Sequence, residues 1–108
     1  MSEDDDEYQY EYVNNTSNCK YAIYAVDAPP DEIAFNGKCF VYDKPDEFFS
    51  NKAFVSEILN NPTYMDLLKI CDKQIEESND FHHIFFEGIH IIKKISDNVT
   101  QIELILCS

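Results

Sequence analysis

The sequence has little glycine, no tryptophan and no long apolar run, and each shortage excludes a class of protein. Gly37 and Gly88 are the only glycines, too few for a glycine-rich phosphate loop. The lack of tryptophan weakens the case for an aromatic cage. No apolar run reaches the roughly 18 residues of a membrane-spanning helix, and the acidic N-terminus lacks the basic stretch of a signal peptide. We therefore expect an intracellular protein of the cytoplasm or nucleus.

Basic residues are also scarce, because eight Lys and Arg residues stand against 21 Asp and Glu residues and give a formal net charge of −13. A phosphate backbone attracts Lys and Arg, and anionic membrane surfaces do the same. The charge therefore argues against direct binding to nucleic acid or to a membrane. It is compatible with a basic protein partner, with mimicry of nucleic-acid charge, or with solubility alone.

The region from residue 81 to residue 107 predicts a β-hairpin. Two runs rich in Ile, Phe, Leu and Val flank a polar break at residues 96–98, which is the pattern of paired strands. A two-residue turn at Asp97 and Asn98 would place Ile95 opposite Thr100, while a three-residue loop that includes Ser96 competes with it. Gly88 interrupts the first strand and indicates a bulge.

The rest of the chain predicts further strands followed by two helices. Residues 19–26 are apolar on both faces and indicate a central strand. Asn36 and Gly37 predict a turn between short strands at residues 32–35 and 38–42. Residues 46–60 have an imperfect helical spacing. A second helix would begin with Asn61 as N-cap and Pro62 as first helical residue, and it carries an apolar stripe formed by Tyr64, Leu67, Leu68, Cys71 and Ile75.

This order predicts an α+β fold of the type ββααββ. A mostly antiparallel sheet would combine the early strands with the C-terminal hairpin, and both helices would pack on one face. Residues 18–108 would form this single domain. Residues 1–17 would form an acidic, Tyr-rich arm that is either partly disordered or an edge strand.

Candidate catalytic and metal-binding residues give only weak signals. His82, His83 and His90 with Glu87 could transfer protons, but neighbouring His82 and His83 on a strand point to opposite faces. A zinc site needs ligands such as thiols and imidazoles, and four well-separated cysteines contain no Cys-x-x-Cys pair. We expect buried thiols, no catalytic residue, no metal and no cofactor.

The sequence therefore favours a small acidic, non-enzymatic protein-interaction module. Its composition, rich in Ile, Asn, Lys, Asp, Tyr and Phe, is typical of AT-rich genomes and would suit a large DNA virus. The expected partner is another protein with a basic surface, and self-association through a sheet edge is compatible with the fold. Two alternatives stay open, namely a nucleic-acid charge mimic that inhibits a DNA- or RNA-binding protein, and a small metal- or His-dependent enzyme. The predicted partner-binding residues are Asp4, Asp5, Asp6, Tyr8, Tyr10 and Tyr12.

Overall fold

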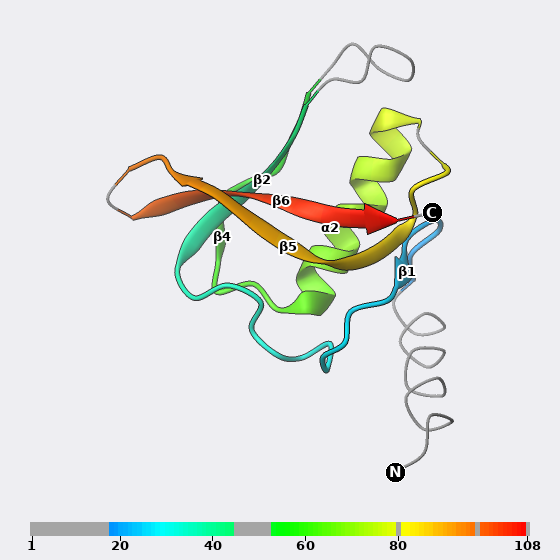
Figure 1. The fold of residues 1–108 in the computed structure, drawn as a ribbon, viewed down its shortest axis with the longest axis horizontal. Coiled ribbons are helices and arrows are strands. Elements are labelled where there is room, and N and C mark those ends of the chain that lie inside the picture. Colours follow the sequence, from blue (N-terminus) through cyan, green and yellow to red (C-terminus); the bar gives the residue numbers. More distant parts are fainter. Residues whose placement is uncertain (1–17, 45–52, 80, 97, 108) are drawn as a thin grey trace.

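The fold consists of one mixed β-sheet and one α-helix, seen in a computed structural model that describes residues 18–44, 53–79, 81–96 and 98–107 (Figure 1). The helix α2 covers one face of the sheet, behind β5 and β6 in the view of Figure 1. The strands and the helix have the bounds β1 Ile23–Tyr24, β2 Lys38–Asp43, β3 Phe54–Val55, β4 Leu59–Asn60, α2 Tyr64–Ser78, β5 Phe85–Lys94 and β6 Val99–Cys107.

The strands follow the order β1-β5-β6-β2-β3 across the sheet, and β4 pairs with β2 beside β3. β5 and β6 form the antiparallel hairpin. β1 lies parallel to β5, and β6 lies parallel to β2. The sheet is therefore mixed, and β6 is its central strand, which joins β1 and β5 to β2 and β3.

The hydrophobic core lies between the sheet and α2. Leu67, Leu68 and Cys71 on the helix are fully buried, as are Phe86 and Ile102 on the sheet. The apolar stripe predicted from the helical spacing is confirmed, because most of it forms the buried face of α2. Within the residues that the structure describes, no helix is both long and apolar enough to cross a membrane.

The predicted ββααββ order is wrong, because the described chain contains one helix and six strands in a mixed sheet. Residues 53–60, the described part of the first predicted helix, form β3 and β4 instead. The Ser56 backbone N–H donates to the Val41 carbonyl at 2.9 Å, and the Ser56 hydroxyl accepts from the Val41 N–H at 2.8 Å. Ser56 thus binds β2 at the point between β3 and β4 where the outer strand is interrupted. This interruption gives Phe54, Val55, Ile58 and Leu59 a spacing that resembles that of a helix.

The early strands also differ from the prediction. β1 is an edge strand rather than a central one, and its apolar residues are covered by the helix and by aromatic neighbours. Tyr24 lies edge-to-face against Phe86, with ring centroids 6.5 Å apart. The predicted hairpin around Asn36 and Gly37 does not form, because Ile33 makes an isolated bridge with Thr63 instead.

The C-terminal hairpin and its bulge are confirmed, but the register is not the one predicted from a two-residue turn. Thr100 lies opposite Lys94 rather than Ile95. The Ile95 N–H donates to the Val99 carbonyl at 2.8 Å, so the longer loop that includes Ser96 connects the strands. The register shifts once between Phe86 and Gly88, as expected for the glycine bulge, and again between Ile91 and Lys93.

The helix begins two residues later than predicted, with Thr63 as its N-cap. The Thr63 side chain accepts from the Asp66 N–H at 3.2 Å, and the Asp66 carboxylate accepts from the Thr63 N–H at 3.0 Å, which completes a capping box. Asn61 instead binds the loop before β2, since its Oδ1 accepts from the Gly37 N–H at 2.6 Å. Asn79, with a positive φ of 61°, ends the helix.

Candidate functional site

The outer edge of β5 is the clearest candidate for a binding site. In the part of the chain that the structure describes, β1 pairs only with Phe85 and Phe86. From Gly88 to Lys94, none of the described strands pairs with β5 on the side that faces away from β6. Figure 1 shows this part of β5 running on from β1 toward the end of the hairpin. An unpaired edge presents backbone N–H and C=O groups to another strand.

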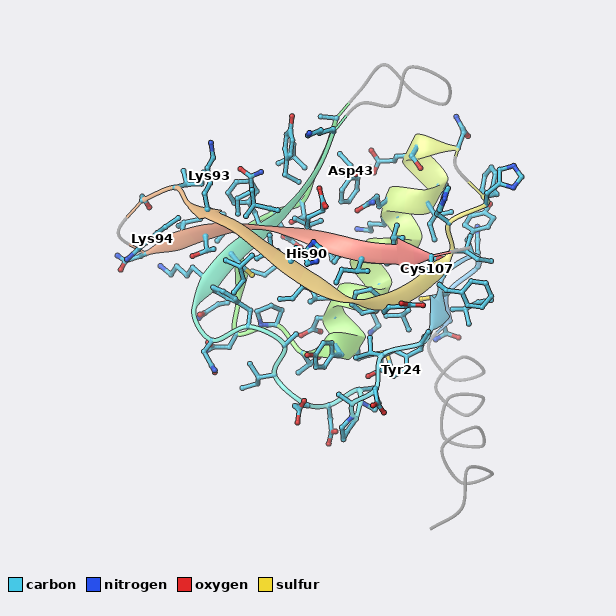
Figure 2. The ribbon with its side chains drawn as sticks, in the orientation of Figure 1. Tyr24, Asp43, His90, Lys93, Lys94 and Cys107 are labelled. Carbon is cyan, nitrogen blue, oxygen red and sulfur yellow. The ribbon has the colours of Figure 1, made fainter. Side chains whose placement is uncertain are left out.

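Large apolar side chains are exposed along the same part of the hairpin. The exposed fractions are 65% for Ile91, 45% for Ile92 and 49% for Ile95. Lys93 and Lys94 are also exposed and lie near the end of the hairpin in Figure 2, with His90 midway along β5. A cluster of exposed apolar residues with a polar rim is typical of an interaction surface.

The two faces of this edge differ in character. Cross-strand partners lie on the same face of a sheet. Ile91 lies opposite the fully buried Ile102, so it extends the apolar face that α2 covers elsewhere. His90 lies opposite Glu103, and Lys93 lies opposite Gln101. A strand added here would therefore meet an apolar face on one side and a polar, partly basic face on the other.

A carboxylate of α2 holds β1 in its short pairing with β5. The Asp72 side chain accepts hydrogen bonds from three consecutive backbone N–H groups, those of Lys20 at 3.1 Å, Tyr21 at 2.7 Å and Ala22 at 2.9 Å. These bonds fix the chain that leads into β1 against the helix. Beyond Val26, the chain runs to the start of α2, where the Met65 N–H donates to the Pro30 carbonyl at 2.9 Å, and none of the described strands pairs with the rest of the β5 edge.

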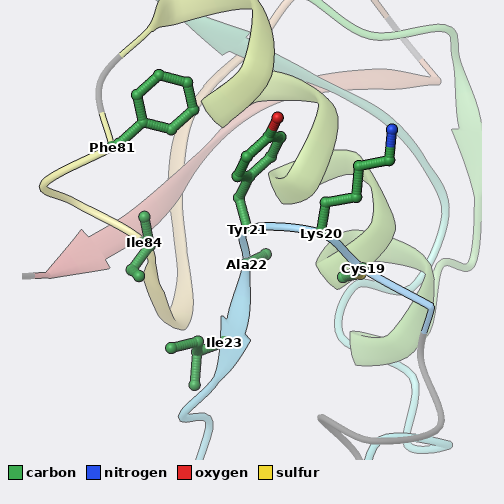
Figure 3. Close-up of a pocket in the computed structure, with 7 residues that line it drawn as sticks. All are labelled: Cys19, Lys20, Tyr21, Ala22, Ile23, Phe81 and Ile84. Carbon is green, nitrogen blue, oxygen red and sulfur yellow. The ribbon is translucent and has the colours of Figure 1, made fainter.

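The surface pockets formed by described residues include two that lie away from this edge. One, of about 350 Å³, lies beside β1 and is lined mainly by apolar groups (Figure 3). Its Tyr21 and Phe81 rings lie 5.1 Å apart, and the backbone N–H groups of Tyr21 and Ala22 are already bound by Asp72. The other, of about 510 Å³, lies between β4 and α2 and includes Ile58 and Ile70.

Neither pocket resembles a catalytic site. No histidine lines either pocket. Gln74 is buried, and its Oε1 has no hydrogen-bond partner among the described residues. Gln74 does not line either pocket. The open edge of β5 therefore remains the stronger candidate.

The predicted histidine cluster is not brought together. His82 and His83 are exposed just before β5, and His90 lies on the strand opposite Glu103. Glu87 sits at the bulge, where its carboxylate accepts a hydrogen bond from the Cys107 thiol and raises the pKa of that thiol. In the described ranges, no three His, Cys, Asp or Glu side chains gather in a way that could hold a metal ion.

All four cysteines are thiols rather than disulfides. Burial raises the pKa of the Cys39 thiol on β2 to about 11. Burial, together with Cys19 and Asp72 nearby, also raises the pKa of Cys71. Raised pKa values keep both thiols protonated, the form that is a poor nucleophile and a poor metal ligand. Cys19, Cys39 and Cys107 do not form the zinc site that their chemistry alone allows.

The predicted partner-binding residues Asp4, Asp5, Asp6, Tyr8, Tyr10 and Tyr12 lie outside the described residues. The charge-mimic alternative requires acids that cluster on the folded surface. On the outer face of α2, the exposed acids Asp66, Glu76 and Glu77 lie among Lys69 and Lys73, so this face is mixed in charge.

The sequence shows the residues of the β5 edge but not that the edge is open. An Ile-Ile-Lys-Lys run follows the glycine in a long predicted strand, and only the structure shows that β1 pairs with the other end of that strand. Comparisons with models of protein families, with curated proteins and with solved structures found no match. Function is therefore inferred from the geometry of this edge.

Proposed function

We propose that the protein is a non-enzymatic interaction module that binds an extended segment of another protein along the outer edge of β5. The observation that carries the proposal is the edge from Gly88 to Lys94, which pairs with none of the described strands and lies beside the exposed side chains of Ile91, Ile92 and Ile95. In strand addition, main-chain hydrogen bonds supply affinity and side-chain contacts on alternate residues supply specificity. This edge offers both.

The charges at the edge restrict which segments bind. Lysines on an edge strand disfavour indiscriminate pairing between sheets. Lys93 and Lys94 instead favour a segment with acidic residues. The binding partner is therefore a protein that presents an extended stretch in which apolar or aromatic residues alternate with polar ones, with acids at one end.

Selection of peptides from a displayed random library tests the proposal. Bound peptides should lose at least about tenfold in affinity, roughly 1.4 kcal/mol, when Ile91 and Ile92 are both changed to Asp. The matched control is Ile58→Asp, because Ile58 is 61% exposed near the opposite edge of the sheet and its variant should bind like the wild type.

Amide hydrogen exchange gives the second measurement. A bound peptide should slow exchange in residues 88–94, whose outer backbone groups lack a described partner. Peptides that bind the Ile91→Asp, Ile92→Asp variant as tightly as the wild type, and leave exchange at β5 unchanged, would contradict the proposal.

A further inference from the structure

We infer that the segment that fits the β5 edge is residues 3–13 of a second copy of this chain. The inference rests on the proposed function and names its partner. Residues 3–7 are Glu-Asp-Asp-Asp-Glu, and residues 8–13 are Tyr-Gln-Tyr-Glu-Tyr-Val. This segment combines acids at one end with alternating aromatic and polar residues, which are the two features that the edge selects.

The alternation matches the two faces of the edge. In an extended segment, Tyr8, Tyr10 and Tyr12 point to one face and Glu11 points to the other. The tyrosine face would lie with Ile91, above the core side of the sheet, and Glu11 would lie on the side of His90. Aromatic residues paired with β-branched residues, and charges paired with opposite charges, stabilise neighbouring strands.

The charges also fix the direction of the added strand. In the antiparallel direction, the acidic residues 3–7 lie beside Lys93 and Lys94, and the tyrosines run back along β5 toward Gly88. In the parallel direction the same acids would approach Glu87 at the other end of the strand, where like charges destabilise pairing. The segment therefore adds antiparallel to β5.

The short link to β1 favours a second copy over the same chain. β1 already occupies the edge at Phe85 and Phe86, so a segment of the same chain would have to pass around it. The chain that leads into β1 bends at Lys20 and Tyr21, where Asp72 binds it against α2. The link from Val13 to Cys19 spans at most about 20 Å when fully extended. Because this link starts from a point bound to the helix, it has little length for the detour around β1, whereas a second copy has no such limit.

Pairing of one β5 edge with another is disfavoured for a different reason. Such a ladder would bring two sets of Lys93 and Lys94 into one strand pair, and like charges across strands are destabilising. Only the N-terminal segment of a second copy carries the opposite charge in a strand-forming pattern.

Sedimentation velocity on the full chain tests the inference through complementation. One variant disables the edge by Lys93→Glu and Lys94→Glu, and another disables the segment by Tyr8→Ser, Tyr10→Ser and Tyr12→Ser. We expect the wild type to self-associate, each variant alone to associate at least about tenfold more weakly, and an equal mixture to form a complex of one copy of each. Lys69→Glu with Lys73→Glu, on the outer face of α2, is the charge-matched control and should associate like the wild type.

A charge exchange provides the rescue. Asp4→Lys, Asp5→Lys and Asp6→Lys, added to the Lys93→Glu, Lys94→Glu chain, should restore self-association, because the attraction is then reversed in sign but not lost. Each variant should retain the fold, because Lys93 and Lys94 are exposed. Circular dichroism of each variant checks this.

Each other outcome overturns the inference. A wild-type chain that stays monomeric, or an edge variant that associates like the wild type, excludes the second copy as partner. The chain could instead stay monomeric and show slow exchange in β5 that is lost when Tyr8, Tyr10 and Tyr12 are changed. That result would place the segment on the β5 edge of the same chain. If displayed peptides still bind the edge in these cases, the proposed function stands and only its partner is wrong.

Discussion

The carboxylate of Asp72 in the middle of α2 accepts a hydrogen bond from the Tyr21 backbone N–H at 2.7 Å, across 51 residues of sequence. The same side chain also binds the N–H groups of Lys20 and Ala22. Hydrogen bonds to a charged acceptor are stronger than neutral ones, and amides that lose their partner are costly. We expect Asp72→Ala to lower the free energy of unfolding by about 2–3 kcal/mol, measured by urea denaturation.

Two companion variants separate this role from a general effect of charge. Asp72→Asn keeps one oxygen acceptor and should lose less stability than Asp72→Ala. Glu76→Ala removes an exposed carboxylate of the same helix and should change the free energy of unfolding by less than about 0.5 kcal/mol. Equal losses for Asp72→Ala and Glu76→Ala would show that the three hydrogen bonds contribute nothing.

Gly88 adopts a φ of +154° at the bulge of β5, a conformation that side-chain-bearing residues rarely adopt. We expect Gly88→Ala to destabilise the domain by about 1–3 kcal/mol, measured by thermal or urea unfolding. An added Cβ would meet only the Ile105 Cδ1 at 3.8 Å, which is ordinary contact. The loss of stability in Gly88→Ala should therefore persist when Ile105→Val also removes that methyl group. If the double variant regained stability, crowding against Ile105 rather than the backbone conformation of Gly88 would cause the loss.

The raised pKa of Cys39 predicts how stability depends on alkaline pH. Its thiol has a pKa of about 11 in the folded protein, against an ordinary value of 9.0. Between these values the unfolded chain has lost the proton that the folded chain keeps, so the free energy of unfolding falls as the pH rises. Below pH 9 the contribution is fully present.

A comparison with Cys39→Ala isolates this contribution. The variant is less stable overall, because it removes a buried side chain, but its stability should fall less steeply between pH 9 and pH 11 than that of the wild type. Tyrosines and lysines that titrate in the same range are shared by both proteins and cancel. Parallel curves would mean that the Cys39 thiol ionises as readily in the folded chain as in the unfolded one.

Local patterns predicted the elements that local interactions determine. The helical stripe from Leu67 to Ile75 identifies α2, because that spacing places its apolar residues on one side that must be buried. The β-rich runs around residues 96–98 identify the hairpin, and Gly88 identifies its bulge. Their exact limits depend on competing local interactions. Thr63 and Asp66 form a capping box, whereas Asn61 binds Gly37, and sequence spacing alone does not decide between them.

Sheet order could not be predicted, because it depends on contacts that are distant in sequence. Phe54 and Leu59 belong to a strand interrupted at Ser56, and a break in a period of two resembles the spacing of a helix. Ala22, Tyr24 and Val26 belong to the core that contains the buried face of α2 and Phe86, although among the described strands β1 neighbours only β5. The open edge of β5 follows from that short pairing, so the candidate site could not be located before the fold.

The position of β6 has a consequence for how the domain is made. It is the last described strand along the chain, yet it lies between β5 and β2 and joins them. A nascent chain that still lacks residues 99–107 cannot join β1 and β5 to β2, β3 and β4, so the sheet is complete only after that strand has been synthesised. Until then, apolar surfaces of β2 and β5 stay uncovered, and rapid release or a chaperone would protect them from aggregation.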